Sequence, residues 1–217
     1  MKKIFYLIAL VAVCFLFVQC EQNELNQDYG KHNGHEYVDL GLSVKWATCN
    51  VGANSPEEYG DHFAWGEVKP KYYYHWNTYK YYYEFNNNFT KYTSHDQIVL
   101  DIKDDVACVN WGGMWRMPTK AEQTELVNNC TWTWSTQNGV NGYKVTGINK
   151  NSIFLPAACF MVADSLCLVG RGGYWSTYLK PDTLQDAVAY CLYFNSDTMG
   201  VTDFPRCLGL SVRPVCQ

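Results

Sequence analysis

Short runs of alternating apolar and polar residues, separated by turn signals, fill the second half of this chain and constrain its fold most tightly. Residues 143–145 and 152–155 flank the turn Asn149-Lys150-Asn151 and predict a β-hairpin. Further strand candidates lie at residues 173–177, 187–194 and 208–215. Runs this short are typical of strands rather than of helices. We therefore expect a small, irregular antiparallel sheet in this half.

Two segments in the middle of the chain predict short helices. Thr119 and Glu122 fit a capping box, in which each side chain accepts a hydrogen bond from the backbone of the other residue. Residues 101–109 form a second, shorter candidate. A strand is also expected at residues 39–46, where apolar and polar residues alternate. Together these elements predict an α+β fold with two short helices.

The first twenty residues indicate an export signal that does not belong to the fold. Lys2 and Lys3 precede an apolar run at residues 4–18, which is short for a membrane span of about 20 residues. The run ends at Gln19-Cys20, which resembles a lipoprotein signal whose cysteine carries the lipid after cleavage. An ordinary signal peptide cut nearby and an uncleaved anchor are alternatives, because the residue before a lipidated cysteine is normally small. We expect a signal peptide at residues 1–19 and a lipid on Cys20 that holds the chain at a membrane.

The rest of the chain has the composition of one domain behind a linker. Residues 20–35 are polar and contain Gly30 and Gly34, so they predict a flexible, lipidated tether. No second tract of this kind follows, and we expect a single domain at residues 36–217, long enough to bury a core. The formal net charge is −4, so no basic surface is indicated and nucleic acid is not an expected partner.

The cysteines permit disulfides without identifying them. Of the 10 cysteines, Cys14 lies in the signal and Cys20 is the lipid candidate, which leaves 8 for the domain. An even number in an exported chain allows disulfide bonds, but their connectivity cannot be deduced from the sequence. Because there is no C-x-x-C spacing and no histidine close to a cysteine, we expect neither a metal site nor a cofactor.

Residues 69–85 are unusually rich in aromatic side chains. Tyrosine, tryptophan and phenylalanine are interspersed here with Lys69, Lys71, His75 and Lys80. Aromatic and basic residues together can form a stacking platform for sugars or bases. The alternative is a long excursion whose rings cover the core of the domain, and we favour it because the local charge is modest.

Six blocks spread along the chain carry a resemblance to a known family. They lie at residues 36–53, 63–67, 110–119, 152–158, 173–176 and 209–215. In this order they resemble the so-called Fibrobacter succinogenes major paralogous domain, which is common in Bacteroidota surface lipoproteins. The resemblance covers nearly all of residues 36–216 and implies a C-type lectin-like fold on an outer-membrane lipoprotein exposed at the cell surface. The chain departs from the family pattern at Gln123, at Cys159 and at residues 206–208.

Motifs of metal-binding lectins and of related enzymes are incomplete in this chain. Trp76-Asn77-Thr78 comes nearest to a calcium signature of sugar-binding C-type lectins, but it lacks the carboxylate that a hard cation prefers. Residues 171–175 resemble the tail of formylglycine-generating oxidases, whereas residues 176–190 contain no cysteine for thiol chemistry. All five histidines precede residue 96, and none has a recognisable Ser or Cys partner. We therefore expect no catalytic residues and no enzyme.

A non-catalytic binding module or adhesin is the function that these features favour. In lectin-like folds the ligand face is often built from the later loops, which here span residues 174–210. The candidates on this segment are Tyr174, Trp175, Tyr178, Lys180, Asp182, Asp197, Met199, Thr202, Phe204 and Leu208. The expected ligand is an unknown glycan or protein held by a few aromatic side chains. A structural subunit of an outer-surface assembly or fimbria is the alternative, and a formylglycine-generating-type enzyme ranks last.

Overall fold

The computed structural model describes residues 29–83, 85, 88–181 and 186–217 and has an α+β fold with mostly antiparallel strands. The helical elements are η1 (Trp76–Thr78), η3 (Ile102–Asp104), α2 (Val106–Trp111) and α3 (Lys120–Asn129). The strands are β1 (Tyr29–His32), β2 (His35–Val38), β3 (Lys45–Ala47), β4 (Tyr82–Tyr83), β5 (Asn88–Phe89), β6 (Thr131–Gln137), β7 (Val140–Thr146), β8 (Ser152–Pro156), β9 (Phe160–Val162), β10 (Ser165–Cys167), β11 (Gly172–Leu179), β12 (Val188–Phe194), β13 (Met199–Pro205) and β14 (Val215–Cys216). The expected signal peptide and Cys20 lie outside the described residues.

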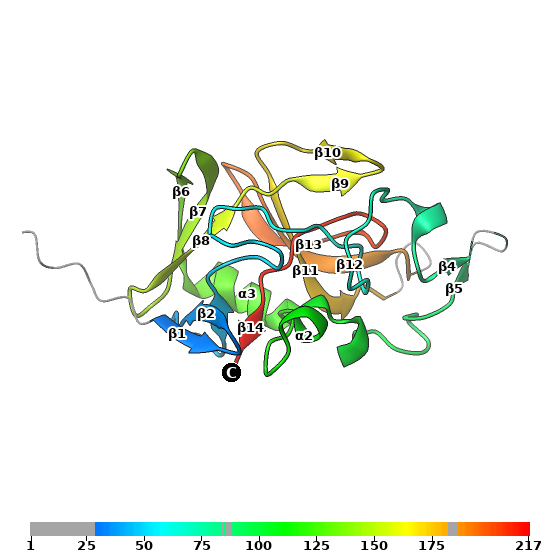
Figure 1. Cartoon of the computed structure of the whole chain (residues 1–217), viewed down its shortest axis with the longest axis horizontal. Helices are drawn as coiled ribbons and strands as arrows, with labels where there is room; N and C mark the ends of the chain where they lie inside the picture. The colour runs from blue at the N-terminus through cyan, green and yellow to red at the C-terminus, as the bar shows by residue number, and fades with distance from the viewer. Residues whose placement is uncertain (1–28, 84, 86–87, 182–185) are drawn as a thin grey trace, which may run out of the picture.

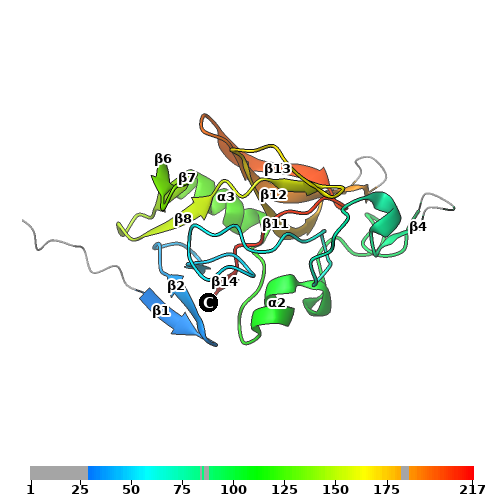
Figure 2. The same cartoon turned by 45° about the horizontal axis from the view of Figure 1, so that its top comes forward.

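Two three-stranded antiparallel sheets form the centre of the domain. Their strand orders are β6-β7-β8 and β11-β12-β13, and α3 lies between them in both views (Figures 1 and 2). Leu126 of α3 is fully buried in a cluster that it shares with Tyr143 of β7 and Phe194 of β12. A four-stranded sheet of order β1-β2-β3-β14 pairs the last strand with an early one. The two central sheets therefore share one apolar core with α3.

Helix α3 begins at the predicted capping box. The Thr119 hydroxyl accepts a hydrogen bond from the Glu122 amide at 3.2 Å, and the Glu122 carboxylate accepts one from the Thr119 amide at 2.8 Å. Gln123 is fully buried, and its side-chain amide donates to the carbonyls of Tyr174 and Trp175 at 2.9 and 3.2 Å. This glutamine therefore attaches α3 to β11 by hydrogen bonds.

The folded part begins earlier than the boundary expected at residue 36. Residues 29–38 form the β1–β2 hairpin, and its turn places Asn33 and Gly34 in the left-handed region at φ 44° and 87°. The Trp115 indole donates to the His32 carbonyl at 2.8 Å, which docks the hairpin on the segment after α2. The tether prediction was therefore wrong for residues 29–35, because they are fixed by strand pairing and by contacts with distant tryptophans.

Strand predictions failed where the pairing partner is distant or where a turn interrupts the pattern. Residues 39–44 bury Leu40 and Val44 but do not form a strand, because Gly41 turns the chain at φ 73°. The expected strand at 208–215 is reduced to isolated bridges, including Leu210 with Phe63, and to the short β14. The expected hairpin around residues 149–151 is confirmed by the pairing of β7 with β8.

The aromatic excursion contributes rings to the core of the domain. Tyr74, Tyr79 and Tyr81 are 2, 3 and 5 % exposed, which confirms that rings from this segment cover the core. Tyr72 and Phe85 are 82 and 92 % exposed, so only part of the segment is used in this way. Within the described ranges, no helix is long and apolar enough to cross a membrane.

The eight cysteines expected in the domain all lie in the described ranges, and all of them are free thiols. Burial raises the pKa of the Cys207 thiol to about 12, and that of the fully buried Cys191 thiol also lies well above its usual value. These two thiols are therefore protonated at neutral pH and act as small apolar side chains.

Candidate functional site

Two of the ligand candidates on the tail belong to the interior. Tyr174 and Trp175 are 1 and 0 % exposed. The Tyr174 hydroxyl donates to the Pro156 carbonyl at 2.6 Å, and the Trp175 indole donates to the Phe63 carbonyl at 2.7 Å. Both polar tips are therefore used inside the core. The two rings hold β11 in place and cannot contact a ligand at the surface.

The candidates on β13 are divided between opposite faces of their sheet. Met199 pairs with Phe194 and packs into the cluster that contains α3. Phe204 lies on the other face, with its ring centroid 4.9 Å from that of Phe160. Thr202 shares the face of Phe204, since successive side chains on a strand alternate. This segment was expected to be loop, but it is an edge strand that cannot present all its candidates together.

The remaining candidates on the tail are also scattered. Lys180 is ion-paired with Asp203 at 2.5 Å, and half-buried Tyr178 forms a bridge with Val99. Asp197 lies in the turn between β12 and β13, where its amide donates to the Asn195 side chain. Leu208 packs partly into the cluster of Phe160. Asp182 lies outside the described residues. The structure therefore does not bring the predicted residues together into one ligand face.

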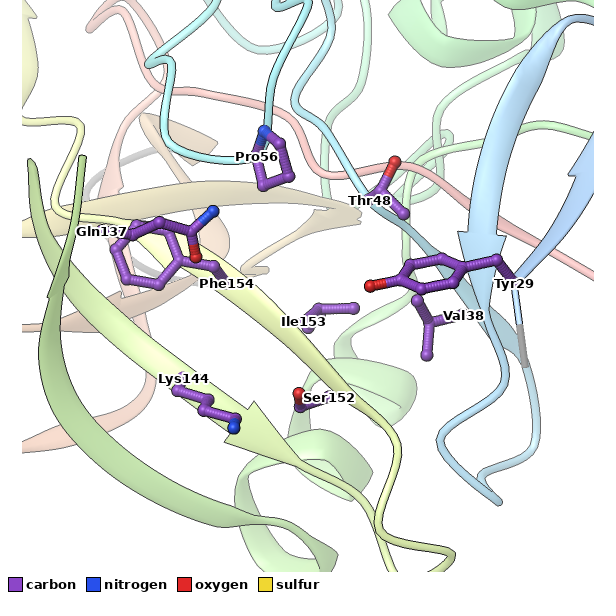
Figure 3. A pocket seen from close by; sticks show the side chains of 9 residues that line it. All are labelled: Tyr29, Val38, Thr48, Pro56, Gln137, Lys144, Ser152, Ile153 and Phe154. Atoms are coloured by element: carbon purple, nitrogen blue, oxygen red, sulfur yellow. The ribbon is translucent and has the colours of Figure 1, made fainter. Parts of the chain in front are cut away.

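A pocket elsewhere in the domain is a better candidate for ligand binding. It has a volume of about 240 Å³ and lies between the β1–β2 hairpin and the β6-β7-β8 sheet (Figure 3). Its lining consists of Tyr29, Val38, Thr48, Pro56, Gln137, Lys144, Ser152, Ile153 and Phe154. None of these residues was predicted from the sequence as a site residue, and they come from segments more than a hundred residues apart.

The alternation of β7 and β8 creates the floor of this pocket. Tyr143 and Leu155 pair across these strands and point into the core, whereas Lys144 and Phe154 pair with each other and face away from it. The same alternation puts Ser152 on the face of Phe154. One side of the sheet is therefore core, and the other presents the exposed Lys144 ammonium beside the buried Phe154 ring.

Gly142 makes room for the aromatic part of the floor. A Cβ atom at this position would lie 2.8 Å from the Phe154 ring and 2.3 Å from the Leu155 carbonyl oxygen. Only a residue without a side chain lets the Phe154 ring lie over β7 in this way. Asn138-Gly139 and Asn141-Gly142 are both typical turn dipeptides. Asn138-Gly139 forms the turn between β6 and β7, whereas Asn141 and Gly142 lie within β7.

The other walls come from the N-terminal hairpin and from the loop at residues 50–60. Tyr29 and Val38 pair directly across the hairpin, and the Tyr29 hydroxyl points toward the middle of the pocket (Figure 3). The loop contributes Pro56. Glu57 holds the loop against β6, because its carboxylate accepts hydrogen bonds from Asn138 at 2.6 Å and Gln137 at 3.2 Å. The bond from Asn138 is the main cause of the lowered pKa of Glu57.

The charge of the pocket is that of one ammonium group. Lys144 is exposed and forms no ion pair with any described residue, and none of the lining residues is a carboxylate, histidine or cysteine. The lining therefore contains no side chain of the types that usually act as a general base. The arrangement can bind a polar or anionic group by hydrogen bonds, with aromatic surface from the exposed ring of Tyr29.

We compared the chain with known proteins. Family models, curated proteins and solved structures were all searched, and none of them matches this chain. The described ranges also contain no cluster of three or more His, Cys, Asp or Glu side chains placed to hold a metal ion.

Proposed function

We propose that this chain is an exported lipoprotein whose folded domain is a non-catalytic binding module. The observation that carries the proposal is the lining of the pocket, which combines hydroxyl, amide and ammonium groups with aromatic surface. Small-ligand sites typically combine apolar surface with a few polar groups that fix orientation. The ligand would enter between the β1–β2 hairpin and the β6-β7-β8 sheet, rather than bind at the tail.

A glycan suits this lining better than an apolar ligand. A sugar ring has an apolar face of C–H groups and an edge of hydroxyl groups. The exposed ring of Tyr29 offers surface for the face, and Thr48 and Gln137 offer partners for the hydroxyls. Lys144 favours a sugar that carries a carboxylate, because a charge-assisted hydrogen bond is stronger than a neutral one.

Location and family follow from the sequence as part of the same proposal. Residues 1–19 are the signal peptide, and a lipid on Cys20 attaches the chain to the outer membrane with the domain exposed at the cell surface. The family resemblance and the lectin-like form of the α+β fold are retained as proposals. Their support is that framework residues of the shared blocks, such as Trp46, Trp65 and Trp115, are among the most deeply buried side chains.

The pocket can be tested on a glycan array with the full chain solubilised from the membranes of the expressing bacterium. The informative variants are Lys144→Ala and Tyr29→Ala, since both side chains are exposed and their loss should leave the fold intact. We expect sugar binding to fall by about tenfold in Lys144→Ala, as for loss of one charged hydrogen bond. Lys103→Ala removes an exposed lysine from η3, outside this pocket, and should bind normally. Equal binding by all four proteins would contradict the proposed site.

A structural subunit of a surface assembly is the second proposal, and the β9–β10 hairpin favours it. Val162, Leu166 and Val169 are 37, 43 and 80 % exposed there, and Leu168 adopts a left-handed φ of 58° that leucine rarely takes. A photo-crosslinking residue at Val169 should then give an adduct of one fixed mass in intact cells, whereas the same residue at Lys103 should not. The lack of such an adduct would count against the assembly role.

A further inference from the structure

A second hollow continues the pocket along the N-terminal hairpin. It has a volume of about 360 Å³, and its lining includes Lys31, Glu36, Asn54 and Trp111. Thr48 lines both this hollow and the pocket of Figure 3. The two spaces therefore adjoin each other at Thr48.

The register of the hairpin shows that the two hollows follow the same face of one element. Tyr29 pairs with Val38, and Lys31 pairs with Glu36. Residues two apart on a strand point to the same side, so these four side chains form two successive rows on one face. The first row lines the pocket, and the second row lines the adjoining hollow. The hairpin is thus the common wall of a longer groove.

The loop at residues 50–60 is the opposite wall of both hollows. Pro56 lines the pocket, whereas Ala53 and Asn54 line the adjoining hollow. Within the loop, the Asn54 backbone amide donates to the Glu58 carboxylate at 2.7 Å, and the Glu57 carboxylate fixes the loop to Gln137 and Asn138 at the end of β6. A wall fixed in this way is already shaped before a ligand arrives, which lowers the entropic cost of binding.

Each hollow carries one exposed ammonium group, and a carboxylate lies opposite the one in the second hollow. Lys31 and Lys144 are exposed, and neither is ion-paired with any residue in the described ranges, although Glu36 lies directly opposite Lys31. Other lysines, such as Lys71 and Lys91, are used in ion pairs. Glu36 is the one carboxylate in the two linings. The groove thus offers a cation in each of its two hollows.

We propose that the two hollows form one groove that binds a linear acidic oligosaccharide, with one carboxylate at Lys144 and another at Lys31. The inference rests on the proposed glycan-binding function and names its ligand class. Tyr29, which is 57 % exposed, supplies the aromatic surface of the first hollow, whereas Phe154 and Trp111 line the groove as largely buried rings. An acidic peptide would be expected to pair its backbone with a strand edge, whereas this groove follows the face of the hairpin.

The experiment compares short and long acidic sugars on the full chain in non-ionic detergent by isothermal titration calorimetry. The probes are tetrasaccharides of galacturonate, mannuronate and hyaluronan, their carboxyl-reduced forms, the matching single uronic acids, and hexaglutamate as a peptide control. We expect at least one acidic tetrasaccharide to bind about tenfold or more tightly than its single sugar and its carboxyl-reduced form, since charged hydrogen bonds form in both hollows.

Variants separate the two hollows. Lys31→Ala should lower tetrasaccharide affinity by about tenfold and leave binding of the single uronic acid unchanged, while Lys144→Ala should weaken both. Lys31→Arg keeps the charge and should restore much of the affinity, and Lys103→Ala should behave like the native chain. Circular dichroism of each variant checks that it is folded.

Each contrary result has a distinct meaning. A chain that binds single and longer sugars equally, with no effect of Lys31→Ala, would overturn the groove and leave the proposed pocket standing. If hexaglutamate binds more tightly than every sugar, the ligand of the groove is an acidic peptide and not a glycan. A chain that binds none of the sugars, acidic or carboxyl-reduced, would overturn both the groove and the proposed function.

Discussion

His35 stacks flat on Trp111, with ring centroids 3.8 Å apart and an angle of 4° between the ring planes. His32 lies directly opposite His35 in the hairpin, and its Nε2 atom accepts a hydrogen bond from the Met114 amide at 2.8 Å. The hairpin that forms one wall of the groove is therefore docked by two histidines.

This docking predicts that the domain loses stability in mild acid. Burial and then the charge of Lys31 lower the pKa of His35, and burial lowers that of His62. The unfolded chain therefore binds more protons than the folded one as the pH falls below about 6.5. The free energy of unfolding should decline from there until the pH passes the lowered pKa values, and urea titrations between about pH 7.5 and 5 measure it.

Two variants test whether His35 is responsible. His35→Phe preserves a ring on Trp111 but cannot be protonated, so its stability should depend less steeply on pH. His95→Gln removes an exposed histidine and should leave the profile unchanged. A His35→Phe profile as steep as that of the native chain would show that the loss of stability originates elsewhere.

We predict a second, larger loss of stability when Arg206 is replaced. Its guanidinium is fully buried and has no carboxylate partner among the described residues. It donates to the Tyr79 hydroxyl at 3.0 Å and to the carbonyls of Tyr92 and Lys91 at 2.9 and 3.0 Å. Arg206→Met would leave these acceptors unpaired, at a cost of at least about 3 kcal/mol. Arg171→Met removes an exposed arginine and should change the free energy of unfolding by less than about 0.5 kcal/mol. Equal urea midpoints for the two variants would contradict this assignment.

Gly142 links the stability of the sheet to the shape of the pocket. Gly142→Ala should cost roughly 1–3 kcal/mol, because its new methyl group collides with the Leu155 carbonyl and the Phe154 ring. Gly200→Ala is the matched control, since nothing lies within 4 Å of a Cβ atom there. Denaturation of both variants measures the difference, and sugar binding should be lost only in Gly142→Ala. If the Gly142→Ala domain is as stable as the control, the Leu155 carbonyl and the Phe154 ring must move to make room for the methyl group at little cost.

The sequence predicted those elements that depend on local signals. The capping box of Thr119 and Glu122 needs only four consecutive residues, and the β7–β8 hairpin needs only its turn. Tyr174 and Trp175 were misplaced because β11 is covered on both faces, by α3 on one side and by the cluster of Phe160 on the other. A strand buried on both sides has no alternation from which an outward residue could be predicted.

The candidate site was beyond the reach of sequence reasoning for a different reason. Tyr29 was assigned to a tether, and Lys144 and Phe154 were treated only as parts of a hairpin. Their proximity depends on how the N-terminal hairpin docks against the sheet, and no local motif encodes that contact. The one feature of the sequence that could have indicated the site is a lysine on a strand face that points away from the core. Many surface lysines have this feature, so it does not identify a site.

The last prediction concerns attachment to the membrane. If Cys20 carries the lipid, Cys20→Ser should abolish incorporation of an alkyne-labelled fatty acid and release the chain from the membrane fraction, because the acyl chains provide the binding energy. Cys14→Ser lies in the expected signal and should keep both the label and the membrane location. Labelling at the native level in Cys20→Ser would show that the lipid is attached elsewhere. A native chain without label would instead favour an ordinary signal peptide or an uncleaved anchor, and the mass of the mature N-terminus would distinguish these two.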